Sequence, residues 1–202
     1  MKIICVGRNY GLHAQELGND IPDSPVIFLK PETALLKPNE TFYLPSFSND
    51  IHHEIELVVK IDKIGKSIAP PFAKKYYSQV TVGIDFTARD LQTELKSNGL
   101  PWELAKAFDH SAVVGRFVPL KQLEVQNLDF ELHKNEIVVQ KGNSKDMLFS
   151  VDEIISYVSK FFTLKTGDLI FTGTPAGVSR VDISDRLIGF LNNEQMFDIQ
   201  VK

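Results

Sequence analysis

The chain has 202 residues, with 26 acidic and 22 basic side chains and a formal net charge of −4. This balance argues against a surface for nucleic acid or anionic membranes, which needs an excess of lysine and arginine. Because Cys5 is the only cysteine, an intrachain disulfide and a cysteine-based zinc site are excluded. The apolar runs are too short for a bilayer span or a signal peptide. We therefore expect a cytoplasmic protein, with neither nucleic acid nor a membrane among its partners.

The first half of the chain is predicted to consist mainly of strands. Short apolar runs and alternating apolar and polar positions, which are typical of buried and half-buried strands, occupy residues 2–6, 26–29, 51–61 and 80–87. Residues 7–18 can hold one or two helical turns before a break rich in glycine and proline. Thr87 and Asp90 are spaced like a capping box, so we expect a second short helix to begin there and to end before Pro101.

The second half is predicted to contain two hairpins, a strand over residues 169–172 and one amphipathic helix. The hairpins cover 129–140, around Lys134 and Asn135, and 186–201, around Asn192 and Asn193. Ser150 and Glu153 form another capping-box pair. The helix that follows is predicted to bury an apolar stripe made of Val151, Ile154, Ile155, Val158, Phe161 and Phe162. Without a repeat or a linker, residues 1–202 are expected to form one β-rich α+β domain.

Three carboxylates are the main candidates for a functional site. Glu54 and Glu56 are two apart in a predicted strand, so they share a face and repel each other unless solvent or a cation compensates. Asp85 lies within the next alternating strand, where aspartate is unfavourable, beside Gly83, which leaves room for a ligand. Together they would form an oxygen-only site for Mg²⁺ or Mn²⁺, or for Ca²⁺ in a larger cavity. A solvated outer face of the strand is the alternative.

A second candidate group is His13 with Glu16, three residues apart on one face of the first predicted helix. A carboxylate raises imidazole basicity and fixes the tautomer, so the pair can act as a general base; an exposed helical pair is the alternative. Lys106 is unremarkable by itself. Residues 173–177 are either a turn or a loop whose amides and Thr174 hydroxyl hold a carboxylate. The other histidines are expected to be structural or surface residues: His52, His53, His110 and His133.

Several segments match the motifs of one known family. They are residues 5–10 with His13 and Glu16, 28–31, 53–57, 83–92, 101–102 with Ala105 and Lys106, 167–168 and 172–175. In this combination the sequence resembles the fumarylacetoacetate hydrolase superfamily, closest to its short branch of acylpyruvate hydrolases and oxaloacetate decarboxylases. The resemblance implies a mixed β-roll that assembles as a homodimer. Neither the N-terminal domain nor the extra aspartate ligand of some larger relatives is evident, so the chain is expected to be the catalytic domain alone.

The resemblance also implies roles for individual residues. His13 and Glu16 would be the base dyad on a mobile lid that orders when substrate binds, and Lys106 would stabilise oxyanion charge. The metal ligands for Mg²⁺ or Mn²⁺ would be Glu54, Glu56 and Asp85. The substrate contacts would be Arg89, Gln92, Thr174 and Lys30.

The implied reaction is a metal-dependent cleavage of a C–C bond in a 2-oxo acid, through an enolate. In an acylpyruvate, His13 assisted by Glu16 would activate a water that attacks the distal carbonyl, whereas oxaloacetate would lose CO₂. An alternative is isomerisation or decarboxylation of 2-hydroxy-diene dioates, or hydration of 2-oxo-enoates, in aromatic catabolism. Another is a non-catalytic domain that binds an organic acid with a metal, although a binding protein needs no base dyad.

Overall fold

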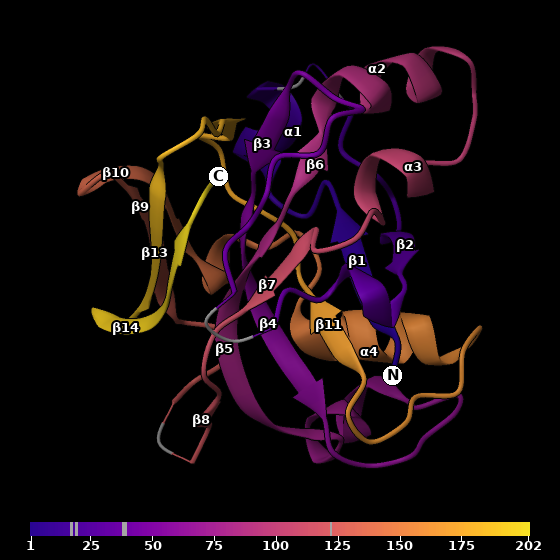
Figure 1. Cartoon of the computed structure of the whole chain (residues 1–202). Coiled ribbons are helices and arrows are strands. Elements are labelled where there is room, and N and C mark those ends of the chain that lie inside the picture. Colours follow the sequence, from indigo (N-terminus) through magenta and orange to yellow (C-terminus); the bar gives the residue numbers. More distant parts are fainter. Residues whose placement is uncertain (17, 19, 38–39, 122) are drawn as a thin grey trace.

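The computed structural model describes residues 1–16, 18, 20–37, 40–121 and 123–202. Its largest sheet has seven strands: β1 (Ile3–Gly7), β2 (Val26–Lys30), β4 (Ile55–Ile61), β5 (Tyr77–Asp85), β7 (Ala112–Val114), β8 (Val118–Pro119) and β11 (Leu169–Phe171). Their order is β2-β1-β11-β4-β5-β7, and β8 also pairs with β5 (Figure 1). The sheet is mixed, because β1 runs parallel to β11 while the other pairs are antiparallel.

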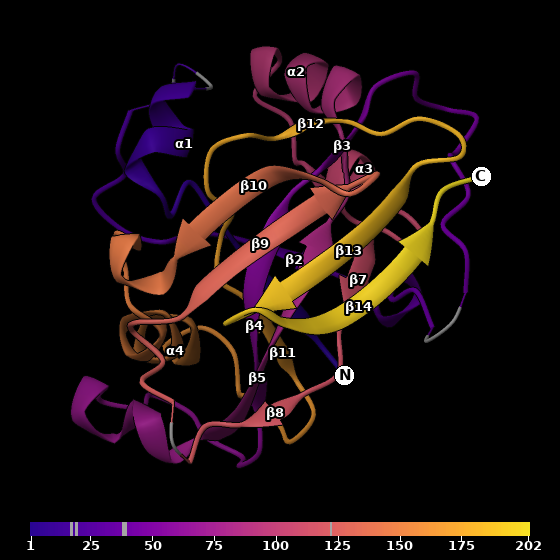
Figure 2. The same cartoon turned by 90° about the vertical axis from the view of Figure 1, so that its left-hand side faces the viewer.

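Two smaller sheets complete the β structure. One has the order β10-β9-β13-β14 and is built from β9 (Asp129–Lys134), β10 (Ile137–Asn143), β13 (Arg186–Leu191) and β14 (Glu194–Gln200). The other has the order β12-β3-β6 and is built from β3 (Ile51–His53), β6 (Thr87–Ala88) and β12 (Ser179–Arg180). Figure 2 shows the four-stranded sheet lying across β4 and β5 of the large sheet. The prediction of a β-rich α+β fold is confirmed.

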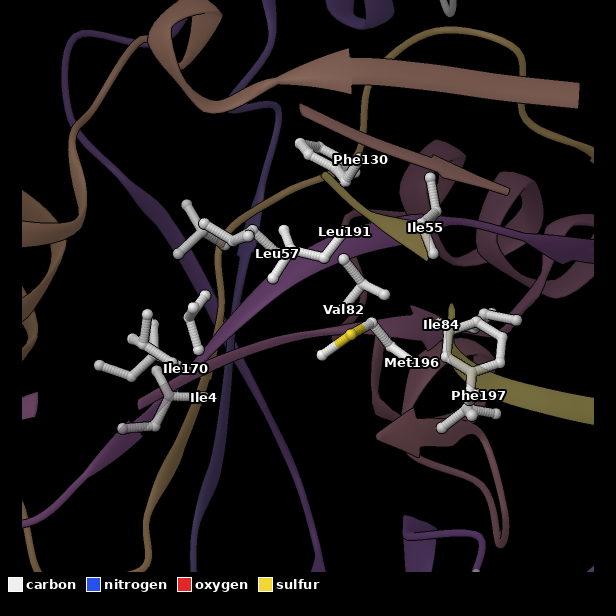
Figure 3. Close-up of a cluster of buried hydrophobic side chains, with 14 of the residues drawn as sticks. Ile4, Ile55, Leu57, Val82, Ile84, Phe130, Ile170, Leu191, Met196 and Phe197 are labelled. Carbon is white, nitrogen blue, oxygen red and sulfur yellow. The ribbon is translucent and has the colours of Figure 1, made fainter. Parts of the chain in front are cut away.

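The main hydrophobic core lies between the seven-stranded and the four-stranded sheets. Alternate residues of β4, such as Leu57, point into it and belong to the same apolar cluster as Phe130 of β9 and Phe197 of β14 (Figure 3). Glu56 and Val58 are on the opposite face of β4, where Val58 joins a smaller apolar cluster. The alternation seen in the sequence therefore separates a core face from a face that carries the carboxylates.

Helices cover the ends and edges of these sheets. They are α1 (Gly11–Glu16), α2 (Arg89–Ser97), α3 (Glu103–Lys106) and α4 (Val151–Ser159), with 3-10 turns η1 (Glu32–Ala34), η2 (Pro70–Lys75) and η3 (Ser144–Asp146). α1 and α2 lie at one end of the molecule and α4 toward the other (Figures 1 and 2). Within the described residues, no helix has the length and apolar character to cross a membrane.

The predicted helix over the 150s is confirmed, but its stripe ends earlier than expected. Ser150 and Glu153 form the full capping box at its start. The prediction that Phe161 is buried is wrong, because α4 ends at Ser159 and the Phe161 side chain is 60% exposed. Phe162 is only half-buried. Beyond the last helical turn, the helical spacing no longer decides which way a side chain points.

The predicted capping box at the start of α2 is wrong. The N-cap is Ala88, which has no side-chain cap. Thr87 instead belongs to β6 and is paired with His52 of β3. Asp90 accepts hydrogen bonds from the Ser48 hydroxyl at 2.6 Å and the Asn49 amide at 3.0 Å. A long-range strand pairing thus keeps Thr87 extended and places the N-cap one residue later.

Both predicted hairpins are present, and the first turns one residue later than expected. Lys134 pairs with Ile137, so the turn residues are Asn135 and Glu136, with φ values of 52° and 70°. Positive φ at both positions is the conformation of a type I′ turn, which suits the twist of two antiparallel strands.

Candidate active site

Three buried carboxylates meet where the seven-stranded sheet passes into the three-stranded sheet. Glu54 lies between β3 and β4, Glu56 is in β4, and Asp85 is the last residue of β5. The pairing of Glu56 with Gly83 and a 2.9 Å hydrogen bond from the Asp85 amide to the Glu54 carbonyl fix this register. One oxygen from each carboxylate lies within 4.8 Å of the other two. We call Glu54, Glu56 and Asp85 the acidic triad, and the structure brings all three together as the sequence predicted.

The charges of the acidic triad are compensated unequally. Burial opposes ionisation of Glu54, but Lys106 Nζ at 2.7 Å and Arg89 Nη2 at 2.5 Å outweigh it and lower the pKa of this carboxyl. The pKa of Glu56 is raised, by burial and by the neighbouring charges of Asp85 and Glu54. Glu56 accepts a 2.7 Å hydrogen bond from the Gly173 amide, and no ion pair of Glu56 is present among the described residues. Glu56 is therefore the carboxylate of the triad whose charge its neighbours offset least.

This arrangement fits a divalent cation. Carboxylate oxygens are the ligands preferred by hard cations such as Mg²⁺, Mn²⁺ and Ca²⁺, and a cation would offset the charge of Glu56. The space beside Gly83, however, is not open to a ligand as predicted. A methyl group at Gly83 would collide with the Val113 carbonyl and would approach the Phe171 ring to 2.9 Å. The glycine is required because β7 and Phe171 pack directly against β5.

Two lysines reach the acidic triad from different sides. Lys106 Nζ donates to Glu54 at 2.7 Å, to Asp85 at 2.8 Å and to the Thr87 hydroxyl at 2.6 Å. Burial opposes the ammonium form, but Asp85 and Glu54 raise the pKa of Lys106. Lys30 lies behind Asp85: its fully buried Nζ is 2.7 Å from Asp85 Oδ1, donates to the Lys106 carbonyl, and is absent from the cavity wall. Lys106 can thus meet a ligand, whereas Lys30 supports Asp85.

His13 projects from α1 over the same cavity, and Glu16 of the same helix contacts His13. His13 is buried and lines the cavity, and its Nδ1 lies 3.1 Å from Glu16 Oε2. Glu16 also accepts a 3.0 Å hydrogen bond from the Gly177 amide. The sequence allowed the 173–177 loop to be a simple turn or a loop whose amides hold a carboxylate. The loop amides do hold carboxylates, but these are the side chains of Glu16 and Glu56. Nδ1 is engaged, so Nε2 is the nitrogen of His13 left to face a ligand.

Thr174 lines the cavity, and a buried side-chain amide holds its hydroxyl in place. Gln140 of β10 donates to Thr174 Oγ1 at 2.9 Å and accepts from the Ile55 amide at 3.0 Å and from His53 Nδ1 at 2.8 Å. Burial lowers the pKa of His53 to about 4, so this imidazole is neutral near pH 7. Ser179 Oγ lies 2.8 Å from its Nε2. His53 thus supports the site from beneath. Gln140 was missed because its side chain reaches the site from another sheet.

The cavity mouth contains two cations that the sequence reasoning missed. Arg89 and Gln92, both predicted substrate contacts, line the cavity together with Lys96. Their spacing of i, i+3 and i+7 places them on one face of α2, and this spacing was the signal that could have identified Lys96. Arg8 lines the cavity beside Trp102, which follows α2 in the chain. Arg8 lies in the segment 5–10 that matched a family motif, but no role was assigned to it.

The chain belongs to the fumarylacetoacetate hydrolase family: residues 2–198 match the fumarylacetoacetate (FAA) hydrolase C-terminal family. The mitochondrial oxaloacetate tautomerase FAHD1 of Bos taurus is 42% identical over 92% of this chain and 84% of that protein. The mitochondrial oxaloacetate decarboxylase of Dictyostelium discoideum is 40% identical over 98% of this chain and 93% of that protein. The structure of fumarylpyruvate hydrolase from Pseudomonas aeruginosa, in complex with Mn²⁺ and pyruvate, has a TM-score of 0.94 and 36% identity, covering 100% of this chain and 89% of that one.

These comparisons confirm the family resemblance seen in the sequence. The chain is an enzyme of this family, with divalent-metal-dependent activity. The relatives carry the names of three different reactions, so the reaction of this chain has to be argued from its own site.

Proposed function

We propose that this enzyme interconverts the enol and keto forms of oxaloacetate, with Mg²⁺ or Mn²⁺ held by the acidic triad. One observation carries the proposal: His13, whose Nδ1 contacts Glu16, lines a single cavity together with the acidic triad. A keto–enol conversion needs a base placed beside a site that stabilises an enolate, and it needs neither a bound water nor a leaving group. Relatives named oxaloacetate tautomerase, at 42% and 40% identity, support this choice of reaction.

The metal and the side chains around it would have different roles in binding the substrate and stabilising its charge. Bound at the triad, the cation would stabilise negative charge on the keto oxygen of the substrate. The Lys106 ammonium adds a second positive charge on the same side of the cavity. Arg89, Gln92 and Thr174 line the cavity and are placed to bind the carboxylate next to the keto group. Ca²⁺ would be accepted as an oxygen-liganded substitute.

The proton is moved by His13. In the keto-to-enol direction, Nε2 takes a proton from C3, and the keto oxygen gains one from solvent; the reverse direction returns both. The 3.1 Å contact from Nδ1 to Glu16 fixes the tautomer that leaves Nε2 able to accept a proton. The Gly177 amide holds Glu16 in turn, so the ring orientation depends on the 173–177 loop. These contacts make His13 the general base and Glu16 its positioning residue.

Hydrolysis of fumarylpyruvate is a second candidate, supported by the structural neighbour that binds Mn²⁺ and pyruvate. In that reaction His13 would take its proton from a water rather than from C3. The same residues serve both reactions, which differ in whether a water stands between Nε2 and the substrate. Decarboxylation of oxaloacetate would need no base, so it does not explain why His13 and Glu16 are paired beside the acidic triad.

A panel of substrates tests the proposal. The purified enzyme is assayed for decay of enol-oxaloacetate absorbance, release of CO₂ from oxaloacetate, and hydrolysis of acetylpyruvate and fumarylpyruvate. Each assay is run with Mg²⁺, with Mn²⁺ and with EDTA. We expect the largest kcat/KM for the enol–keto conversion and its loss in EDTA. A larger kcat/KM for hydrolysis or for CO₂ release would replace the proposed reaction, and a rate unaffected by EDTA would refute metal dependence.

A further inference from the structure

The cavity carries more positive charge than the chemistry at the acidic triad requires. Four cationic side chains line it, namely Arg8, Arg89, Lys96 and Lys106, against the three carboxylates of the triad. With a divalent cation at the triad, the formal charge would rise from one positive charge to three. A substrate with a single carboxylate would leave much of this charge uncompensated, whereas a dicarboxylate would offset two charges.

Arg8 is held at the mouth by an unusual backbone conformation. It follows β1 directly and has a φ of 58°, which costs energy for a residue with a side chain and is found preferentially at functional sites. Its guanidinium carbon lies 5.9 Å from the centre of the Trp102 ring, which packs on Phe28 with ring centres 6.1 Å apart. Arg8 forms no ion pair within the part of the chain that the structure describes. Its charge is thus positioned by an aromatic wall and is available to an anion.

Lys96 approaches the same point from α2. It is about two helical turns beyond Arg89 and lines the cavity together with Arg8. Burial lowers the pKa of Lys96, and the charges of Arg8 and Arg89 lower it further. Three cations are therefore close enough to repel one another. A carboxylate bound among them would turn this repulsion into attraction.

We infer that Arg8 and Lys96 bind the second carboxylate of the substrate, and thereby make the enzyme selective for 2-oxo dicarboxylic acids over 2-oxo monocarboxylic acids. This inference rests on the proposed function, because it takes the first carboxylate and the keto oxygen to lie at the acidic triad. Arg8 and Lys96 are half-buried whereas the triad is buried, so they are placed to meet the end of the substrate that is farther from the triad. The inference holds equally for oxaloacetate and for fumarylpyruvate, since both carry a second carboxylate.

The test compares two four-carbon acids that differ at one end. Oxaloacetate has a carboxylate where 2-oxobutyrate has a methyl group. The KM and kcat for oxaloacetate and the inhibition constant of 2-oxobutyrate are measured for the wild type, Arg8→Gln, Lys96→Gln and Arg8→Lys. The rise in thermal-unfolding midpoint with each acid in the presence of Mn²⁺ gives a second readout that does not depend on turnover. Lys74→Gln, an exposed lysine in η2, controls for the change in net charge.

We expect Arg8→Gln to raise the KM for oxaloacetate by about 10- to 100-fold, because a hydrogen bond between charged groups contributes about this much. The inhibition constant of 2-oxobutyrate should not change. Lys96→Gln should act in the same direction, Arg8→Lys should restore part of the affinity, and Lys74→Gln should have no effect. Equal weakening of both acids in Arg8→Gln would show a structural role and overturn the inference, as would unchanged binding of oxaloacetate.

The result also separates this inference from the proposed function. A wild type that is inactive on oxaloacetate but is stabilised by it far more than by 2-oxobutyrate would refute the reaction and retain the dicarboxylate selectivity. An active wild type whose KM for oxaloacetate is unchanged in Arg8→Gln and Lys96→Gln would retain the reaction and refute the selectivity.

Discussion

The floor and the rim of the cavity are built in different ways. The floor is the acidic triad with Lys106, and all four side chains are buried. Strand pairing between β4 and β5 sets the spacing of the carboxylates, and Lys106 reaches them from α3. The rim is α1, Arg8 and the exposed end of α2, which individual side-chain contacts hold in place, such as the hydrogen bond from Gly177 to Glu16. The sheet register fixes the positions of the triad carboxylates. His13, in contrast, lies on the short helix α1, where the hydrogen bond from Gly177 to Glu16 helps to orient it. Metal binding should therefore depend on the floor, and proton transfer and selectivity on the rim.

The largest effect is expected from a change in the floor. Glu56→Gln keeps an acceptor for the Gly173 amide but removes the least compensated charge of the acidic triad. Affinity for Mn²⁺ should fall by about 100-fold or more, since loss of outer-shell partners alone costs about 10- to 100-fold. Turnover should be lost with it. The metal-free variant should be at least as stable as the wild type, because repulsion with Asp85 and Glu54 is removed.

Calorimetric titration with Mn²⁺ and urea unfolding in EDTA measure both effects. Glu194→Gln, an exposed position of β14, is the matched control and should change neither. Wild-type affinity for Mn²⁺ in Glu56→Gln would show that the acidic triad is not the metal site.

A change in the rim should separate catalysis from metal binding. His13→Ala removes the general base, and positioned proton transfer contributes about 10²- to 10⁴-fold to rate. We expect kcat to fall in this range while Mn²⁺ affinity stays at the wild-type value. His133→Ala, a partly exposed histidine of β9, should leave both unchanged. Comparable losses of metal affinity and rate in His13→Ala would show that metal binding depends on the rim as well as on the floor.

His53, which is buried next to the acidic triad, should make the stability of the protein depend on pH. His53 has a pKa of about 4 in the folded protein, below its ordinary value of 6.5. As pH falls below 6.5, the unfolded chain binds a proton that folded His53 excludes, so stability is lost. Between pH 6.5 and 5 this contribution should reach at most about 2 kcal/mol. Carboxylates of lowered pKa, such as Glu54, weaken the fold only at lower pH.

Urea unfolding in EDTA at pH 7.5, 6.5 and 5 measures this loss in the wild type and in His53→Gln. The variant should be less stable at pH 7.5 but should lose less stability on acidification. Parallel pH profiles for the two proteins would show that His53 is accessible to protons in the folded state.

The smallest effect is expected from a change in Glu16, which accepts a hydrogen bond from the Gly177 amide. Glu16→Gln retains a side-chain oxygen for the Gly177 amide and loses the charge that supports His13. We expect kcat to fall by about tenfold, less than in His13→Ala, because the orientation of the ring is kept while the carboxylate charge beside it is lost. Glu16→Ala should be more severe, and Gln15→Ala, a change at an exposed neighbour, should be neutral. Equal rates in Glu16→Gln and Glu16→Ala would show that the hydrogen bond to Gly177 has no part in catalysis.

Local patterns predicted those parts of the fold that depend on neighbours in the sequence. The alternation gave the correct face for Glu56 in β4, although Glu54 lies between β3 and β4 and not within one continuous strand. The box at Ser150 and Glu153 gave the correct helix start. The similar spacing of Thr87 and Asp90 failed because β6 pairs with β3, which is a partner that spacing cannot reveal. Phe161 failed for a related reason, since the helix ended before reaching it.

The sequence by itself determined the residue types of the site and the faces on which they lie, because strand and helix periodicities depend only on local backbone geometry. It placed Glu54, Glu56 and Asp85 on one side of two strands, and His13 beside Glu16. Only the tertiary structure decided which charges compensate one another. It put Lys30 behind Asp85 and brought Arg8 and Lys96 together at the mouth. Electrostatic interactions act through space between segments far apart in the chain, so the charge balance exists only once the sheets and α2 are packed together.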